Sequence, residues 1–165
     1  MRRFHIIGGK NHGKTILVVE LVEEFMRRGI TVGTIKHTHH RHELDIPGKD
    51  SHRHRLAGAA AVGILTPSMM ATYLPAPQNA SEVDRYLMLA PMFMRCQLVI
   101  VEGDVHALAP KIEVWRGELH SLPLASHDKS VLAIVTDDPS PIAGRILPRS
   151  DVRGLAEWIL KNLCL

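Results

Sequence analysis

The residues best suited to chemistry lie close to the amino terminus. The segment GGKNHGKT, residues 8–15, matches the spacing G-x-x-x-x-G-K-[ST] with nothing inserted. Backbone N–H groups of such a loop surround a phosphate, and its glycines let the chain turn tightly beside the anion. Lys14 is expected to reach the outer phosphates, where it would also act in catalysis, and the Thr15 hydroxyl to ligate magnesium. The nucleotide-binding residues predicted in this loop are Gly8, Gly9, Lys10, Asn11, His12, Gly13, Lys14 and Thr15.

A second acid is needed because magnesium that bridges phosphates must also be held from another strand. Glu102 follows the apolar run 98–101 and is the candidate. A carboxylate at the carboxyl end of a buried strand faces the crevice in which α/β sheets bind ligands. Glu102 is therefore predicted as a catalytic residue and magnesium ligand. The alternative is a solvated side chain that closes the strand.

Histidines are concentrated in residues 37–54, which contain six of the eleven in the chain. Imidazole suits zinc, copper and nickel, so metal binding is one interpretation. A second interpretation is that a set of charged and polar residues surrounds the phosphates or the attacking water: Lys36, His37, Lys49, Asp50, Arg53 and Arg55. Asp50 would then be catalytic, holding magnesium through water or positioning that water. The alternatives are a surface loop without a ligand and, for Asp50, a helix cap.

Strands that alternate with helices are expected to position these residues. An apolar strand at 4–7 precedes the phosphate loop, and an amphipathic helix follows it and stops at Gly29. Asp50 or Ser51 is expected to cap a short helix, and Ser150 or Asp151 the last one. Further strands are expected at 31–36, at 60–66 paired with 69–74, and at 97–103, 111–115 and 131–135. The pattern predicts an α/β fold of the P-loop NTPase type, with a mostly parallel sheet and helices on both faces.

Composition sets the remaining limits. With 165 residues, 45% hydrophobic and 22% charged, we expect a single domain over residues 1–165. A net charge of +3 and 4% aromatic residues argue against a dedicated nucleic-acid binder. Cys96 and Cys164 have no metal-ligand spacing, and no apolar run is long enough for a signal peptide or a membrane span. These features favour a cytoplasmic protein without a membrane partner.

Three stretches together resemble the molybdopterin-guanine dinucleotide biosynthesis protein B (MobB) family. They are GGKNHGKT, the long run VGTIKHTHHRHELDIPGKDSHRHRLAGA, and LVIVEG followed by PKIEVWR. The long run is the most specific, because phosphate loops are shared by many NTPases. Departures from the family pattern are Ile16, His12 and Asp104. The last puts any partner or cofactor contact just after Glu102 in doubt.

The resemblance implies a magnesium-dependent GTP-binding protein with weak GTPase activity that forms homodimers. It also implies a partner, the nucleotidyltransferase that joins GMP to molybdopterin, with molybdopterin itself as a further candidate ligand. By position, it assigns the phosphates and magnesium to Gly8, Gly13, Lys14 and Thr15 and the second-strand acid to Glu102. The run His37-Thr38-His39-His40 and the turn Gly48-Lys49-Asp50-Ser51 fall where the family keeps its own signature near the nucleotide.

Two other functions remain open from the residues alone. One is a histidine-rich P-loop GTPase that delivers a metal ion as a metallochaperone, and the other is a small-molecule kinase. The residues alone also do not identify the base of the nucleotide. The guanine-recognition motif [NT]-K-x-D has only a partial match, Thr136-Asp137-Asp138, which lacks the lysine. A carboxylate there could pair with guanine, or these could be solvated turn residues.

Overall fold

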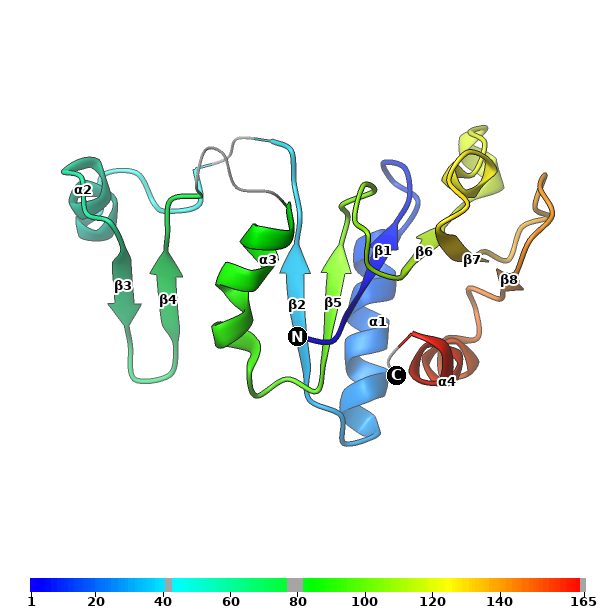
Figure 1. The fold of residues 1–165 in the computed structure, drawn as a ribbon, viewed down its shortest axis with the longest axis horizontal. Coiled ribbons are helices and arrows are strands. Elements are labelled where there is room, and N and C mark those ends of the chain that lie inside the picture. The colour runs from blue at the N-terminus through cyan, green and yellow to red at the C-terminus, as the bar shows by residue number, and fades with distance from the viewer. Residues whose placement is uncertain (41–42, 77–81, 164–165) are drawn as a thin grey trace. The chain divides into compact units, whose positions relative to one another are not determined.

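The computed structural model describes residues 1–40, 43–76 and 82–163. Figure 1 shows the elements of the chain, which forms two compact units. The first consists of Met1–Thr38 and Leu89–Leu165, and the second of His39–Met88.

The first unit is built on a six-stranded sheet whose described neighbours are all parallel. Its strand order is β2 (Val32–Lys36), β5 (Leu98–Glu102), β1 (Arg3–Ile7), β6 (Lys111–Val114), β7 (Val131–Val135) and β8 (Ile146–Leu147). β1 is hydrogen-bonded to both β5 and β6, so Ile6 lies opposite Glu102 on one side and Ile112 on the other. Because the strands are parallel, their carboxyl ends meet at one edge of the sheet, which is where ligands bind in open α/β sheets.

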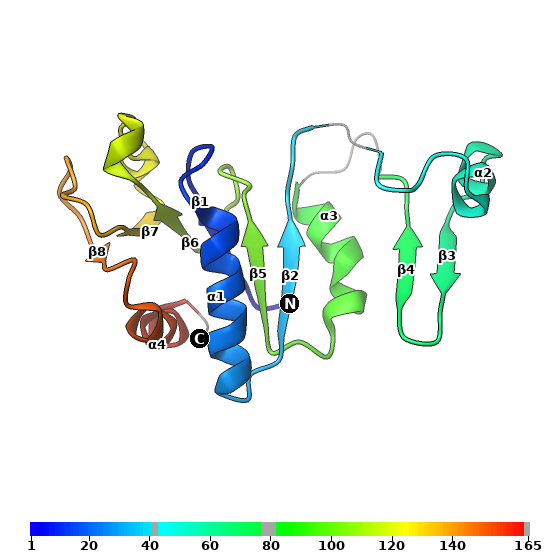
Figure 2. The same cartoon turned by 180° about the vertical axis from the view of Figure 1, so that it is seen from behind.

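Two helices cover one face of this sheet. α1 (Lys14–Arg27) and α4 (Val152–Asn162) pack against each other, and Figure 2 shows α1 in front of the strands. Alternate residues of the central strands, such as Phe4, Ile6 and Ile100, meet Leu21 of α1 in the core and are all fully buried. Every second residue of the strands and one apolar face of the helix, which repeats every 3.6 residues, therefore pack into the same apolar layer.

Short 3₁₀ turns pack on the opposite face. Phe93, in η1 (Ala90–Phe93), lies so close to Gly33 that a Cβ on the glycine would be 2.5 Å from its ring. The buried Glu113 carboxylate accepts N–H bonds from Leu124 and Ala125, the first residues of η3 (Leu124–Ser126), at 2.7 and 2.9 Å. Burial raises the pKa of Glu113, while these two bonds lower it. A third turn is η2 (Gly117–Leu119).

The second unit contains a short helix and a hairpin. α2 (Asp50–Leu56) contacts β3 (Val62–Leu65), which pairs antiparallel with β4 (Met70–Tyr73) through a turn closed by Thr66 and Met69. α3 (Glu82–Leu89) runs to the end of this segment. Large apolar side chains on α2 and the hairpin are strongly exposed, among them Leu56, Leu65, Met69 and Met70 at 71, 79, 70 and 83%.

The predicted α/β class with its parallel sheet is confirmed, as is the hairpin of the second unit. The expected cap of α2 by Asp50 or Ser51 is wrong: Lys49 is the N-cap without a side-chain bond, and the Ser51 hydroxyl donates to Asp45 instead. Asp151 does cap α4, by accepting the Gly154 N–H at 2.9 Å. β8 was not predicted, and the single-domain interpretation stays a prediction. Among the residues described, no helix has the length and apolarity to cross a membrane.

Candidate nucleotide site

The loop between β1 and α1 has the backbone that its sequence predicts. Gly8 and Gly13 adopt φ values of 145° and 93°, and Asn11 is left-handed at 67°. A Cβ on Gly8 would overlap the Val114 carbonyl oxygen, and one on Gly13 would be 2.9 Å from the Arg116 guanidinium. Gly8 therefore needs glycine for conformation and for space, while Gly13 needs it for its left-handed conformation, because the Arg116 side chain could move aside. Figure 1 shows this loop beyond the carboxyl end of β1.

The Lys14 side chain folds back over the loop and is held there by backbone carbonyl groups of the loop. Its ammonium group donates to the carbonyl oxygens of Gly8 and Gly9 at 2.9 and 2.7 Å. Burial lowers the pKa of Lys14, the neighbouring Lys36 lowers it further, and Glu102 raises it. The arrangement places a partly buried positive charge at the amino end of α1, where the helix dipole also favours an anion.

Thr15 and Glu102 are brought together from different elements. The Thr15 hydroxyl donates to Glu102 Oε1 at 2.7 Å, and Lys36 Nζ lies 3.6 Å from the same oxygen. The exposed α1 start and the carboxyl end of β5 thus bring together a hydroxyl and a carboxylate, which are oxygen ligands that magnesium accepts. The donor set fits the predicted ion, although its binding remains a prediction.

His37 follows directly after β2. Its backbone N–H donates to the Glu102 carbonyl oxygen at 2.9 Å, which continues the ladder between β2 and β5. Gly103 comes so near to this backbone that a Cβ would be 2.9 Å from the His37 carbonyl oxygen, and its φ is 95°. The sequence Glu-Gly at the end of β5 therefore fixes the position of the His37 backbone beside Glu102.

His12 is a buried anchor of the loop, a role that sequence reasoning missed. It is 3% exposed, its Nδ1 accepts the Arg116 backbone N–H at 2.9 Å, and its Nε2 lies 3.2 Å from the Ser121 hydroxyl. Burial lowers the pKa of His12, as do the charges of Lys14 and Arg116. The partners lie 104 and 109 residues away in the sequence, so only a prediction that β6 lies beside β1 could have found them.

The remaining predicted residue, Asp50, lies in the second unit as the first residue of α2, where it is exposed. Other polar side chains of the same unit interact with one another. Asp45 accepts bonds from the Ser51 hydroxyl and the Ile46 N–H, and Glu43 pairs with Arg55. The hydrogen bond from Arg55 lowers the pKa of Glu43 to about 2.

The metal interpretation gains no support from the described histidines. No group of three or more His, Cys, Asp or Glu side chains that could hold an ion occurs among residues 1–40, 43–76 and 82–163. His42 lies outside these residues, as does Cys164.

A groove and a cavity lie near the two ends of the site. A groove on the Glu102 side of the loop runs between α1 and β2, and Thr15, Lys36 and Glu102 lie at its end. The cavity is lined by residues that follow the carboxyl ends of β6 and β7 and is called the β6–β7 cavity. Its lining residues are Trp115, Gly117, Glu118, His120, Ser121, Leu122, Asp138, Pro139 and Pro141.

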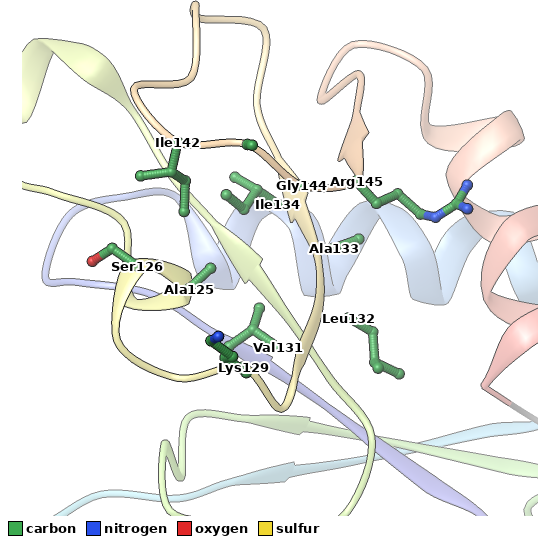
Figure 3. A pocket seen from close by; sticks show the side chains of 11 residues that line it. Ala125, Ser126, Lys129, Val131, Leu132, Ala133, Ile134, Ile142, Gly144 and Arg145 are labelled. Atoms are coloured by element: carbon green, nitrogen blue, oxygen red, sulfur yellow. The ribbon is translucent and has the colours of Figure 1, made fainter.

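A third cavity lies apart from the loop residues. Figure 3 shows its side chains, which come from β7, from η3 and from the segment that leads into β8. Most are small or apolar, with Lys129 and Arg145 as cations. Because it contains none of the predicted phosphate or magnesium ligands, we do not place the nucleotide there.

Comparison with known proteins identifies the family. A family model described as molybdopterin guanine dinucleotide synthesis protein B matches residues 4–137. The molybdopterin-guanine dinucleotide biosynthesis adapter protein of Escherichia coli K12 is 34% identical over 151 residues, covering 90% of this chain and 86% of its own length. The protein of the same name from Haemophilus influenzae is 35% identical over 156 residues, covering 93% and 85%.

Solved structures agree in fold. A crystal structure described as molybdopterin-guanine biosynthesis protein B superposes with a TM-score of 0.70 at 25% identity, covering 98% of each chain. A MobB homologue from Bacillus stearothermophilus gives a TM-score of 0.68 at 24% identity, covering 99% of this chain and 98% of its own. The loop geometry, the strand order and these matches lead to one conclusion: the chain belongs to the MobB family.

Proposed function

We propose that this protein is an adapter in molybdopterin guanine dinucleotide biosynthesis that binds magnesium and GTP at the loop of residues 8–15. Family membership and the names of the relatives support the adapter role. The observation that carries nucleotide binding is the convergence of Lys14, Thr15 and Glu102 at the carboxyl end of β1 and β5.

Each of these residues has a defined part in binding. Lys14 would exchange its two hydrogen bonds to loop carbonyl oxygens for hydrogen bonds to the outer phosphates. The backbone N–H groups of the loop would surround one phosphate. Thr15 and Glu102 would hold magnesium, which when bound neutralises charge on the outer phosphates. Lys36, whose ammonium group lies 3.6 Å from Glu102 Oε1, would add a second positive charge beside the phosphates.

Hydrolysis by the chain alone is proposed to be slow. Gln97, which could in principle orient water, sits at the amino end of β5 and accepts the Thr31 N–H at 2.9 Å. The other glutamine, Gln78, lies outside the described residues. GTPases hydrolyse GTP slowly when they lack a glutamine that orients the attacking water and an arginine supplied by a partner protein. A slow step suits a protein that acts chiefly by binding a partner.

Assembly with other molecules is part of the proposal. The exposed apolar side chains of α2 and the β3–β4 hairpin are a surface that a second copy of the chain could cover, which supports a homodimer. The partner enzyme is proposed to be the nucleotidyltransferase that makes the guanine dinucleotide cofactor, with molybdopterin as a candidate ligand of the complex.

The decisive experiment is calorimetry with GTP in the presence of magnesium, comparing the wild type with Lys14→Ala. We expect Lys14→Ala to lose binding by at least about 10²-fold, because it removes the one charged side chain fixed within the loop motif and charge-assisted bonds to phosphate are strong. Lys161→Ala, which changes an exposed lysine on α4, is the matched control and should bind normally. Unchanged affinity in Lys14→Ala, with a normal circular dichroism spectrum, would exclude the loop as the phosphate site.

A further inference from the structure

We propose that the β6–β7 cavity seats the guanine base of the nucleotide and that Asp138 is its specificity-determining residue. The proposal rests on nucleotide binding at the loop and adds the side chains that select the base. Thr136, Asp137 and Asp138 only partly match the usual guanine motif, so the sequence alone does not identify the acceptor.

The position of the cavity follows from the strand order. β5 and β6 flank β1 on opposite sides, and the magnesium candidates Thr15 and Glu102 lie on the β5 side. A nucleotide with its outer phosphates at that end must extend its nucleoside toward β6. The cavity meets the loop there, because Ser121, one of its lining residues, lies within hydrogen-bond distance of His12.

Arg116 lies between the loop and the cavity. Its guanidinium packs over Gly13, its backbone N–H is bound by His12, and its side chain is 40% exposed. Its pairing with Glu118 at 3.5 Å is weak, since Glu118 is 70% exposed. A cation held beside the positive end of a helix is favourable when an anion lies between them, so Arg116 is placed to contact the inner phosphate or the base.

The walls of the cavity suit a flat aromatic ring. It measures about 510 Å³, within the range of small-molecule sites, and the exposed Pro139 and Pro141 supply apolar surface, while Trp115, at 5% exposure, contributes little surface itself. Trp115 is held in place by its indole N–H bond to the Ser121 carbonyl oxygen at 2.8 Å. A Cβ on Gly117 would be 3.3 Å from the Trp115 ring and 3.4 Å from Asp138 Cβ, so a larger residue there would crowd both.

The two neighbouring carboxylates have different tasks. Asp137 accepts the N–H and the hydroxyl of Ser150, at 3.0 and 2.9 Å, just before α4, and these bonds lower its pKa. Asp138 instead lines the cavity, where the Gly117 N–H donates to its Oδ2 at 2.7 Å. A carboxylate accepts about four hydrogen bonds, so this one bond orients the group and leaves it able to accept from guanine N1–H and the 2-amino group.

The experiment measures affinity for four magnesium nucleotides by calorimetry: GTP, ITP, XTP and ATP. The wild type is expected to bind GTP about ten- to a hundredfold more tightly than ITP, which lacks the 2-amino donor, and than ATP, whose N1 accepts instead of donating. In Asp138→Asn the amide can donate to the 2-carbonyl of xanthine, so the preference should reverse from GTP to XTP. Asp137→Asn is the matched control and should keep the wild-type order of affinities, whatever its stability.

The outcomes separate this inference from the proposed function. Wild-type protein that binds GTP and ATP equally well, or Asp138→Asn that still prefers GTP over XTP as the wild type does, would overturn the base assignment and leave phosphate binding standing. Failure of all four nucleotides to bind to folded wild-type protein would overturn both.

Discussion

At the scale of single residues, His12 shows how a neutral imidazole can support a binding loop. Because its Nδ1 accepts the Arg116 N–H, that nitrogen carries no proton, and the proton of the neutral ring lies on Nε2, facing the Ser121 hydroxyl. Burial and two nearby cations keep the ring neutral. His12 thereby joins the phosphate loop to β6 without adding charge to it.

The role of Glu102 can be separated from that of the phosphate ligands. Glu102→Gln keeps an oxygen that can accept the Thr15 hydroxyl but removes the negative charge that a divalent cation requires. We expect the affinity for GTP with magnesium to fall by about tenfold or more, and the affinity in EDTA to change little. Calorimetry under both conditions measures the difference.

Glu157→Gln, on the exposed face of α4, is the control for loss of a surface carboxylate. An equal loss of affinity with and without magnesium in Glu102→Gln would mean that Glu102 acts on the loop structure and is no magnesium ligand.

At the scale of elements, the acid at the start of α2, Asp50, could either stabilise the helix or take part in catalysis. Capping is excluded for Asp50, since Lys49 occupies the N-cap without a side-chain bond. A charge in the first turn of a short exposed helix contributes about 0.3–1 kcal/mol through the helix dipole. Catalytic participation would change the hydrolysis rate far more than it changes stability.

The catalytic role predicted for Asp50 from the sequence implies that Asp50→Asn shifts Tm by no more than about 2–4 °C while reducing magnesium-dependent GTP hydrolysis by about 10²-fold. Asp45→Asn is the comparison, because Asp45 accepts the Ser51 hydroxyl and the Ile46 N–H within the same unit. It should lower Tm and leave the hydrolysis rate per folded molecule unchanged. Hydrolysis that survives in Asp50→Asn would remove Asp50 from the catalytic residues.

At the scale of the whole molecule, the sequence predicts the features that depend on a local pattern of residues. The loop, α1 and the strands carrying Glu102 and Lys36 were found because glycine spacing and apolar periodicity are readable over a few residues. Arg116 and Ser121 were missed because they reach the loop only when β6 docks beside β1. β8 has two residues, too few to form a pattern.

The sheet also contains a buried histidine that links stability to pH. His5, in the middle of β1, is fully buried, and its Nδ1 lies 3.3 Å from the Gly103 carbonyl oxygen. Burial lowers its pKa from 6.5 to about 4, partly offset by that contact and by Asp104. Between these two pKa values the unfolded chain binds more protons, so the free energy of unfolding falls as the pH decreases from about 6.5 to 4.

His12 acts in the same direction, because its pKa is also lowered. Glu113 acts in the opposite direction, since its raised pKa makes the folded state bind more protons above its ordinary 4.5. Glu24 and Asp128, whose pKa values are lowered to about 2 by bonds from Arg27 and Lys111, lose their contributions mainly below their ordinary values of 4.5 and 3.8. The histidines therefore dominate the acid side of neutrality.

We expect urea denaturation to show that His5→Gln is less sensitive than the wild type to a change from pH 7 to pH 5, by about 2 kcal/mol from the linkage of this single group. Because both proteins contain His12 and Glu113, the contributions of these residues to the pH dependence cancel in the comparison. His106→Gln, at an exposed histidine, is the control and should follow the wild-type pH dependence. If His5→Gln loses as much stability as the wild type between these two pH values, His5 is not the group that couples folding to protons.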